Sequence, residues 1–128
     1  MQHLTVLWRI RLFNGPILED SDGQEQRHFR SQKVGALLAY LAMRLGKQCA
    51  REEIVYALWP EEDDLQAAAN RLRVTLASLR KQLEPSGTPF GSVIDVSSPG
   101  RIYLRCETVW CDVIEIVTLP HSINLLGL

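Results

Sequence analysis

LQAAANRLRVTLASLRKQL, residues 65–83, is the segment that decides the fold. Its apolar residues recur at alternating steps of four and three, which is the spacing of one buried helix face. They are Leu65, Ala69, Leu72, Leu76, Leu79 and Leu83. Asp63 or Asp64 can cap the start of this helix, and Pro85 follows its end. The sequence therefore predicts a long helix that buries one side and exposes the other.

Two shorter helices are predicted upstream of this segment. Ser31 can cap the first, and Gly46 suits its end. Its apolar positions follow the helical spacing of three and four residues: Val34, Leu37, Leu38, Leu41 and Leu45. Residues 51–59, REEIVYALW, predict the second helix, which begins with two glutamates and stops before Pro60.

Alternating apolar residues and turn signals predict strands at both ends of the chain. Residues 4–13, LTVLWRIRLF, alternate as a half-buried strand does, and short strands near 17–19 and 24–29 complete an antiparallel meander. Towards the C-terminus, residues 93–105 contain VIDV and RIYLR on either side of the turn SSPG, which predicts a β-hairpin. Residues 109–112 can add one more strand.

A β-meander, three helices and a terminal hairpin form an order that is typical of winged helix-turn-helix domains. We therefore expect an α+β fold in which residues 1–112 form one domain, since a chain of 128 residues suits a single core. Residues 113–128 are apolar, contain Pro120 and show no clear period. We expect this tail to be the start of a downstream domain.

Composition narrows the class of protein. Hydrophobic residues make up 46% and charged residues 23%, a balance typical of soluble domains, and no apolar run is long enough to span a membrane. No basic stretch followed by an apolar run opens the chain, so we expect no secretory signal and a cytoplasmic location.

The residues that carry chemistry do not form a catalytic or metal-binding pattern. The three histidines lie far apart, and no Ser, Cys or Asp stands at a catalytic spacing from them. Cys106 and Cys111 with His121 match no common zinc pattern, so we expect two buried, reduced thiols instead. No glycine-rich phosphate loop is present in the sequence. We expect neither an enzyme nor a bound cofactor.

The exposed side of the 65–83 helix carries side chains suited to reading base edges. They are spaced by three or four residues: Asn70, Arg71, Val74, Ser78 and Lys81. Arginine can form a bidentate pair with guanine, asparagine can do so with adenine, and valine can pack on the thymine methyl group. This pattern predicts a recognition helix for the major groove of DNA.

Further side chains are expected to contact the DNA backbone. Arg73, Arg80 and Lys81 flank the predicted reading face and can neutralise phosphates. Ser98 of the hairpin turn, and Arg101 just beyond it, can grip the edge of the minor groove.

Two alternatives remain open at this stage. The charges on the helix also fit an ordinary solvated surface. The net charge of −1 favours a winged-helix module that binds protein and not DNA. Acidic residues cluster at 61–64 and 19–25, whereas the basic residues of the third helix gather at 71–81, which leaves one basic face.

Three stretches resemble one known family: FRSQKVGALLAYLAMRLGKQCAREEIVYALWP, AAANRLRVTLASLRKQL and SPGRIYL. They are similar to the N-terminal domain of activators of the Streptomyces antibiotic regulatory protein type, which is an OmpR-type winged helix. The resemblance covers roughly residues 4–112, and NRLRVTLASLRKQL is its most specific part.

The resemblance implies an activator that binds direct repeats upstream of promoters, contacts RNA polymerase and carries a helical activation domain downstream. It also implies possible self-association on DNA. By position, it assigns the recognition helix to about 65–83, with Asn70, Arg71, Val74 and Ser78 facing bases and Arg80 facing phosphate. The loop before that helix corresponds to a segment that can touch polymerase, and its acidic residues are Glu61, Glu62, Asp63 and Asp64. The same acids suit the positive N-terminus of the helix, and both roles are compatible.

The sequence departs from the family pattern at three places. Ala50 stands where a Ser or Thr cap is common, and the hairpin tip carries no arginine. The segment 118–128 shows no helical repeat, so we expect either a fragment of a longer regulator or a stand-alone regulator.

Overall fold

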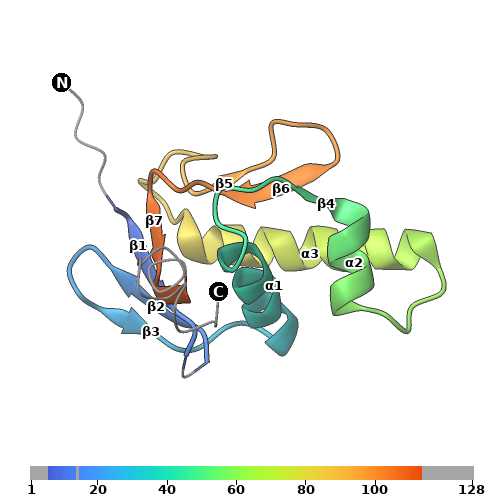
Figure 1. Cartoon of the computed structure of the whole chain (residues 1–128), viewed down its shortest axis with the longest axis horizontal. Coiled ribbons are helices and arrows are strands. Elements are labelled where there is room, and N and C mark those ends of the chain that lie inside the picture. Colours follow the sequence, from blue (N-terminus) through green and yellow to red (C-terminus); the bar gives the residue numbers. More distant parts are fainter. Residues whose placement is uncertain (1–5, 14, 114–128) are drawn as a thin grey trace, which may run out of the picture.

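A computed structural model describes residues 6–13 and 15–113 of the chain. Its helices are α1 (Gln32–Ala42), α2 (Arg51–Leu58) and α3 (Leu65–Leu83). Its strands are β1 (Trp8–Arg11), β2 (Ile17–Asp20), β3 (Glu25–Gln26), β4 (Cys49–Ala50), β5 (Ile94–Asp95), β6 (Arg101–Leu104) and β7 (Val109–Cys111). The expected α+β winged-helix architecture is confirmed, with α3 running through the molecule beside α1, α2 and both sheets (Figure 1). The predicted tail lies almost wholly outside the described residues.

The N-terminal sheet has the strand order β3-β2-β1-β7. β1 pairs antiparallel with β2 as predicted, but β3 is much shorter than the predicted 24–29 strand. On its other edge β1 pairs in parallel with β7, with Trp8 opposite Val109. The Trp8 ring N–H donates a hydrogen bond of 2.8 Å to the carbonyl of Leu83, so this sheet is also fastened to the end of α3.

Local capping explains where the helices begin. Ser31 caps α1 by accepting a hydrogen bond from the backbone N–H of Val34. Asp64, and not Asp63, caps α3, and its carboxylate accepts from the N–H groups of Gln66 and Ala67 at 2.9 and 3.2 Å. Ala50 gives α2 no side-chain cap, but the Glu53 carboxylate accepts from the Ala50 N–H at 3.0 Å.

The core forms where α3 meets α1, α2 and the sheets. Leu72, Leu76, Leu79 and Leu83 are buried, as their spacing predicts. The prediction is wrong at the first turn, where Leu65 is 82% exposed and Ala69 is also exposed. Ala68 and Thr75 are buried instead. The first turn of α3 therefore packs through the side that carries Ala68 and exposes the side that carries Leu65.

We call the hairpin of residues 93–105 the wing. It is joined to the helices by a second sheet with the order β4-β6-β5. β5 and β6 form the predicted hairpin, with Ile94 opposite Leu104. Gly100 in its turn has a φ of 72°, a conformation that glycine adopts without strain. β4, which directly precedes α2, pairs with β6, so backbone hydrogen bonds join the hairpin to the start of α2. None of the helices in the described part of the chain has the length and apolar character to cross a membrane.

Candidate nucleic-acid interface

The side of α3 away from its buried leucines is open to solvent. Asn70, Arg71 and Val74 are all exposed, and Val74 is 61% exposed although it is apolar. Ser78, the fourth predicted base reader, is half-buried at the edge of this face. Ala77 is also exposed there, and sequence reasoning missed it although it continues the spacing from Asn70 and Val74. We call Asn70, Arg71, Val74 and Ala77 the outward face of α3.

Two contacts already orient the polar side chains of this face. The Arg71 Nε donates a hydrogen bond of 3.1 Å to a carboxylate oxygen of Glu62, in the loop before α3. An Arg73 terminal nitrogen donates to the Asn70 side-chain oxygen at 3.4 Å. The sequence placed Arg71 and Glu62 on two different predicted surfaces, and the structure brings them together.

A shallow hollow of about 360 Å³ borders the outward face. Its lining joins the start of α1 and the end of α2 to α3: Ser31, Lys33, Trp59, Asn70, Arg71, Val74 and Thr75. Lys33 donates a hydrogen bond to the carbonyl of Leu58, and its ammonium lies 5.8 Å from the centre of the Trp59 ring. Lys33 is thus a cation beside the predicted reading face that no sequence pattern indicated.

Arg80 does not fit the predicted phosphate contact. Its side chain is only 14% exposed and donates to the Glu84 carboxylate at 2.6 Å and to the Ile94 carbonyl at 3.2 Å. Its guanidinium also stacks 3.9 Å from the centre of the Phe90 ring. Arg80 therefore ties α3 to the segment that leads into the wing. No local sequence pattern indicated these partners, because they come from residues folded back over α3.

Glu84 also joins the end of α3 to the segment that leads into the wing. Its side chain is 2% exposed, and its carboxylate accepts hydrogen bonds from the backbone N–H groups of Gly91, Val93 and Ile94. Burial raises the pKa of Glu84, but the hydrogen bonds from these N–H groups and from Arg80 lower it by more. The net pKa therefore lies below its usual value. The carboxylate stays charged and fixes the start of the wing.

The wing carries the other predicted backbone contacts. Arg101 is exposed, and Ser98 is half-buried and accepts a hydrogen bond of 3.4 Å from Gln48. Behind the turn, the Asp95 carboxylate accepts from the Ser97 hydroxyl at 2.6 Å and from Tyr103 at 2.9 Å. Hydrogen bonds from Ser97 are the main cause that lowers the pKa of Asp95 to about 2. These hydrogen bonds hold together the two strand ends beside the turn that carries Ser98.

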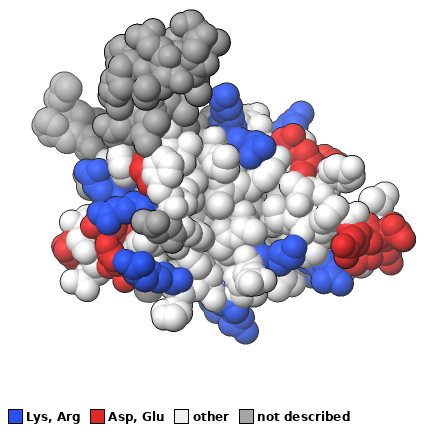
Figure 2. Space-filling model, turned by 60° about the horizontal axis from the view of Figure 1, so that its bottom comes forward, with Lys and Arg blue, Asp and Glu red and all other residues white. Residues whose placement is uncertain are grey.

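The acidic loop lies at one end of the molecule. Glu61, Asp63 and Asp64 are exposed, while Glu62 is half-buried. Figure 2 shows red acidic side chains gathered at the edge where the α2–α3 loop lies, and blue basic side chains in separate groups elsewhere on that face. One oxygen of Asp64 is engaged in capping α3, so part of this acidic run supports the helix N-terminus.

Two large apolar side chains near this loop were not anticipated from the sequence. Leu65 and Tyr56 are among the most exposed apolar residues described, and both line a cavity of about 410 Å³ between α2 and α3. The spacing of α3 had assigned Leu65 to the core. No sequence signal distinguished Tyr56 from an ordinary helix surface residue.

The cysteines bear on the expected absence of a metal. Cys111 is buried as expected, but Cys106 is exposed because it lies in the turn between β6 and β7. His121 lies outside the described residues. Within residues 6–13 and 15–113, no group of three or more His, Cys, Asp or Glu side chains is placed to hold a metal ion.

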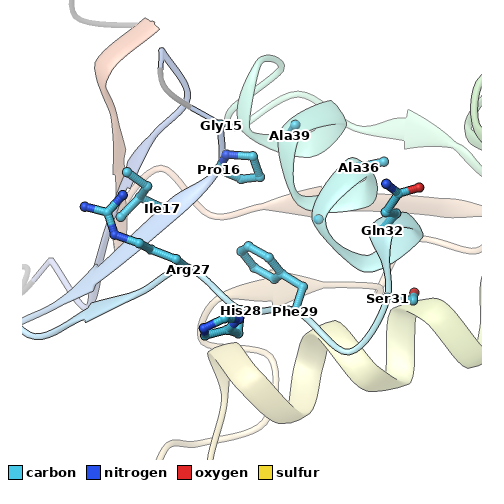
Figure 3. Close-up of a pocket in the computed structure, with 11 residues that line it drawn as sticks. Gly15, Pro16, Ile17, Arg27, His28, Phe29, Ser31, Gln32, Ala36 and Ala39 are labelled. Atoms are coloured by element: carbon cyan, nitrogen blue, oxygen red, sulfur yellow. The ribbon is translucent and has the colours of Figure 1, made fainter.

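Another cavity, of about 630 Å³, separates α1 from the N-terminal strands (Figure 3). Its walls are mostly small or apolar, including Pro16, Phe29, Gly35 and Ala36. Arg27 and His28 approach it from the segment between β3 and α1, and Arg27 pairs with Glu25 at 2.9 Å. This lining holds no arrangement suited to base recognition, so the outward face of α3 remains the candidate site.

Comparison with known proteins shows which family the chain belongs to. A family model described as "Transcriptional regulatory protein, C terminal" matches residues 25–100, from β3 to the turn of the wing, which is more than half of the chain. No curated protein and no solved structure matches the chain. The matched family consists of DNA-binding regulatory domains and is not a family of enzymes. The chain therefore belongs to the OmpR/PhoB-type family of C-terminal domains of transcriptional regulators, which bind double-stranded DNA in the regulation of transcription.

Proposed function

We propose that this chain recognises specific DNA sequences as part of a transcriptional activator, with α3 in the major groove and the 93–105 hairpin as its wing. The observation that carries the proposal is the exposed Val74. It lies one helical turn after Asn70 and Arg71, on the side of α3 opposite its buried leucines. An apolar side chain that the core does not use suits contact with a thymine methyl group.

The proposal assigns distinct roles to the side chains around this face. Asn70, Arg71 and Val74 contact base edges, and Ser78 contacts bases from the rim. The backbone contacts are Arg73, Lys81, Ser98 and Arg101, without Arg80, whose guanidinium is occupied within the fold. Base contacts set sequence preference, whereas backbone contacts set overall affinity.

Selection of bound sequences from a random duplex pool tests the proposal. We expect enrichment of one motif, whose binding weakens steeply as salt rises. Arg71→Ala should then cost about 1 to 3 kcal/mol on that motif and relax the preference at one base pair. A winged-helix module that binds only protein would enrich no motif, and that result would contradict the proposal.

Direct repeats among the selected sequences would support the activator subtype that the sequence resembles. Measuring complexes on one and on two repeats would then test self-association on DNA. Tighter binding of the second chain is expected if neighbouring chains touch.

A contact with RNA polymerase at the acidic loop is the second part of the proposal. The exposed Tyr56 and Leu65 beside that loop favour it, because a mixed apolar and acidic surface suits a basic protein partner better than DNA. Replacing Glu61 and Asp63 together by alanine should lower transcription by purified polymerase and leave DNA affinity at least as high. Unchanged transcription would remove the loop from the activator mechanism.

A further inference from the structure

Glu62 and Arg71 form a link between the α2–α3 loop and the outward face of α3. The Nε of Arg71 donates to one carboxylate oxygen of Glu62 at 3.1 Å. The Arg71 side chain is 56% exposed, whereas the Glu62 side chain is 22% exposed. Glu62 is therefore the more enclosed partner, and Arg71 is the one that reaches into solvent.

Glu62 is itself held in place by the start of α3. Its second carboxylate oxygen accepts a hydrogen bond of 3.3 Å from the backbone N–H of Asp64, the residue that caps the helix. Its backbone N–H donates to the carbonyl of Trp59 at 3.1 Å. Both oxygens of Glu62 are thus engaged, one by the helix cap and one by Arg71, which fixes the direction of the guanidinium relative to the helix.

The nitrogen that Glu62 engages determines what Arg71 can still bind. A guanidinium presents five N–H donors in a planar fork, and a bidentate pair with guanine needs only two of them. A contact through Nε leaves both terminal nitrogens for O6 and N7 of a guanine. It also restricts the rotamers of a long side chain before DNA arrives, so less conformational freedom is lost on binding.

We propose that Glu62 is a positioning residue that sets base preference by holding the Arg71 fork towards a guanine in the major groove. This inference rests on the proposed recognition role of α3. Glu62 does not touch the base and acts only through Arg71. Its negative charge also repels the phosphates, so it gives up some general affinity in exchange for discrimination.

The test compares three single variants with the wild-type chain on the motif obtained by selection. Glu62→Ala removes the acceptor and the charge, whereas Glu62→Gln removes the charge and keeps an oxygen acceptor. Glu52→Ala is the matched control, because Glu52 is an exposed acid of α2 that has no described contact with Arg71. Dissociation constants are measured on the motif and on probes with each base pair replaced in turn.

We expect Glu62→Ala to reduce discrimination at least fivefold at the one base pair that Arg71→Ala also affects, and at no other. Glu62→Gln should keep most of that discrimination and bind all probes somewhat more tightly. Glu52→Ala should leave the discrimination unchanged. A double-mutant cycle combines Glu62→Ala with Arg71→Ala. Because Glu62 acts only through Arg71, Glu62→Ala should not change base preference further once Arg71 is replaced.

Other outcomes would overturn the inference. If Glu62→Ala strengthens binding to every probe alike, Glu62 is only a repelling charge. If it weakens binding to every probe alike and lowers the thermal unfolding midpoint, Glu62 only supports the helix cap. Loss of the proposed function looks different, because the wild-type chain would then select no motif and Arg71→Ala would change no preference.

Discussion

At the scale of single residues, the adjacent cations Arg80 and Lys81 of α3 lie in different environments. Arg80 and Lys81 both appear in the sequence as cations suited to phosphate, yet only Lys81 is exposed. Arg80 is enclosed by Glu84, Ile94 and Phe90. Residue type alone does not separate these cases, because the position of the wing segment decides which cation meets solvent.

This difference in burial predicts different effects of substituting the two adjacent residues. Arg80→Ala should lower the free energy of unfolding by about 3 kcal/mol, since it leaves a buried carboxylate without its ionic partner. Lys81→Ala should leave stability nearly unchanged and reduce the salt dependence of DNA binding by about one phosphate contact. Urea unfolding and salt titrations of both variants check this pair of expectations.

If Arg80→Ala instead preserves stability and weakens binding to every sequence, the original phosphate role of Arg80 is restored.

At the scale of elements, the start of α2 is the least well capped of the three helices. Ser31 and Asp64 supply side-chain caps to α1 and α3, whereas the N-cap residue of α2 is Ala50, which has only the hydrogen bond to the Glu53 carboxylate. The local conformation at Ala50, with φ of −69° and ψ of 140°, already lies in the extended region that N-cap residues adopt.

Ala50→Ser should therefore complete a capping box and raise the free energy of unfolding by about 0.5 to 1 kcal/mol. Ala57→Ser is the control, because Ala57 is exposed inside α2, where serine cannot cap. Thermal and urea unfolding of both variants give the comparison. Equal effects at the two positions would show that the gain does not come from capping.

At the scale of the whole molecule, charge is only partly segregated, since Arg11 pairs with Glu19 and Glu25 among the strands, and the total is nearly neutral. The acids of the α2–α3 loop occupy one end, and the basic side chains form separate groups instead of one broad patch (Figure 2). A net charge of −1 means that long-range attraction to DNA is weak. In the proposed function, specific contacts of α3 and the wing therefore supply most of the binding.

The proposed phosphate contacts of Arg73, Lys81 and Arg101 determine how steeply salt should weaken the binding. The slope of the logarithm of the binding constant against the logarithm of salt concentration should be about −3 for each bound chain. A titration of one-repeat and two-repeat probes between low and moderate salt measures it. A slope near zero would show that these three side chains do not contact the DNA backbone. A much steeper slope would mean that further cations, such as Lys33, contact phosphates as well.

The sequence by itself determined that three helices form, that Ser31 caps the first, and that Leu72, Leu76, Leu79 and Leu83 are buried, because periodicity and capping depend on residues close together in the chain. It also placed Asn70, Arg71 and Val74 on the open side of α3, since four core leucines fix the opposite side.

Only the tertiary structure decided which of the remaining side chains are free. Leu65 is exposed although Ala68 in the same turn is buried, Arg80 is covered by the segment that leads into the wing, and Glu62 of the α2–α3 loop pairs with Arg71. β7 pairs with β1 from the far end of the domain. The physical reason is the same each time. Burial and pairing depend on which distant segments fold together, and a local sequence pattern contains no information about them.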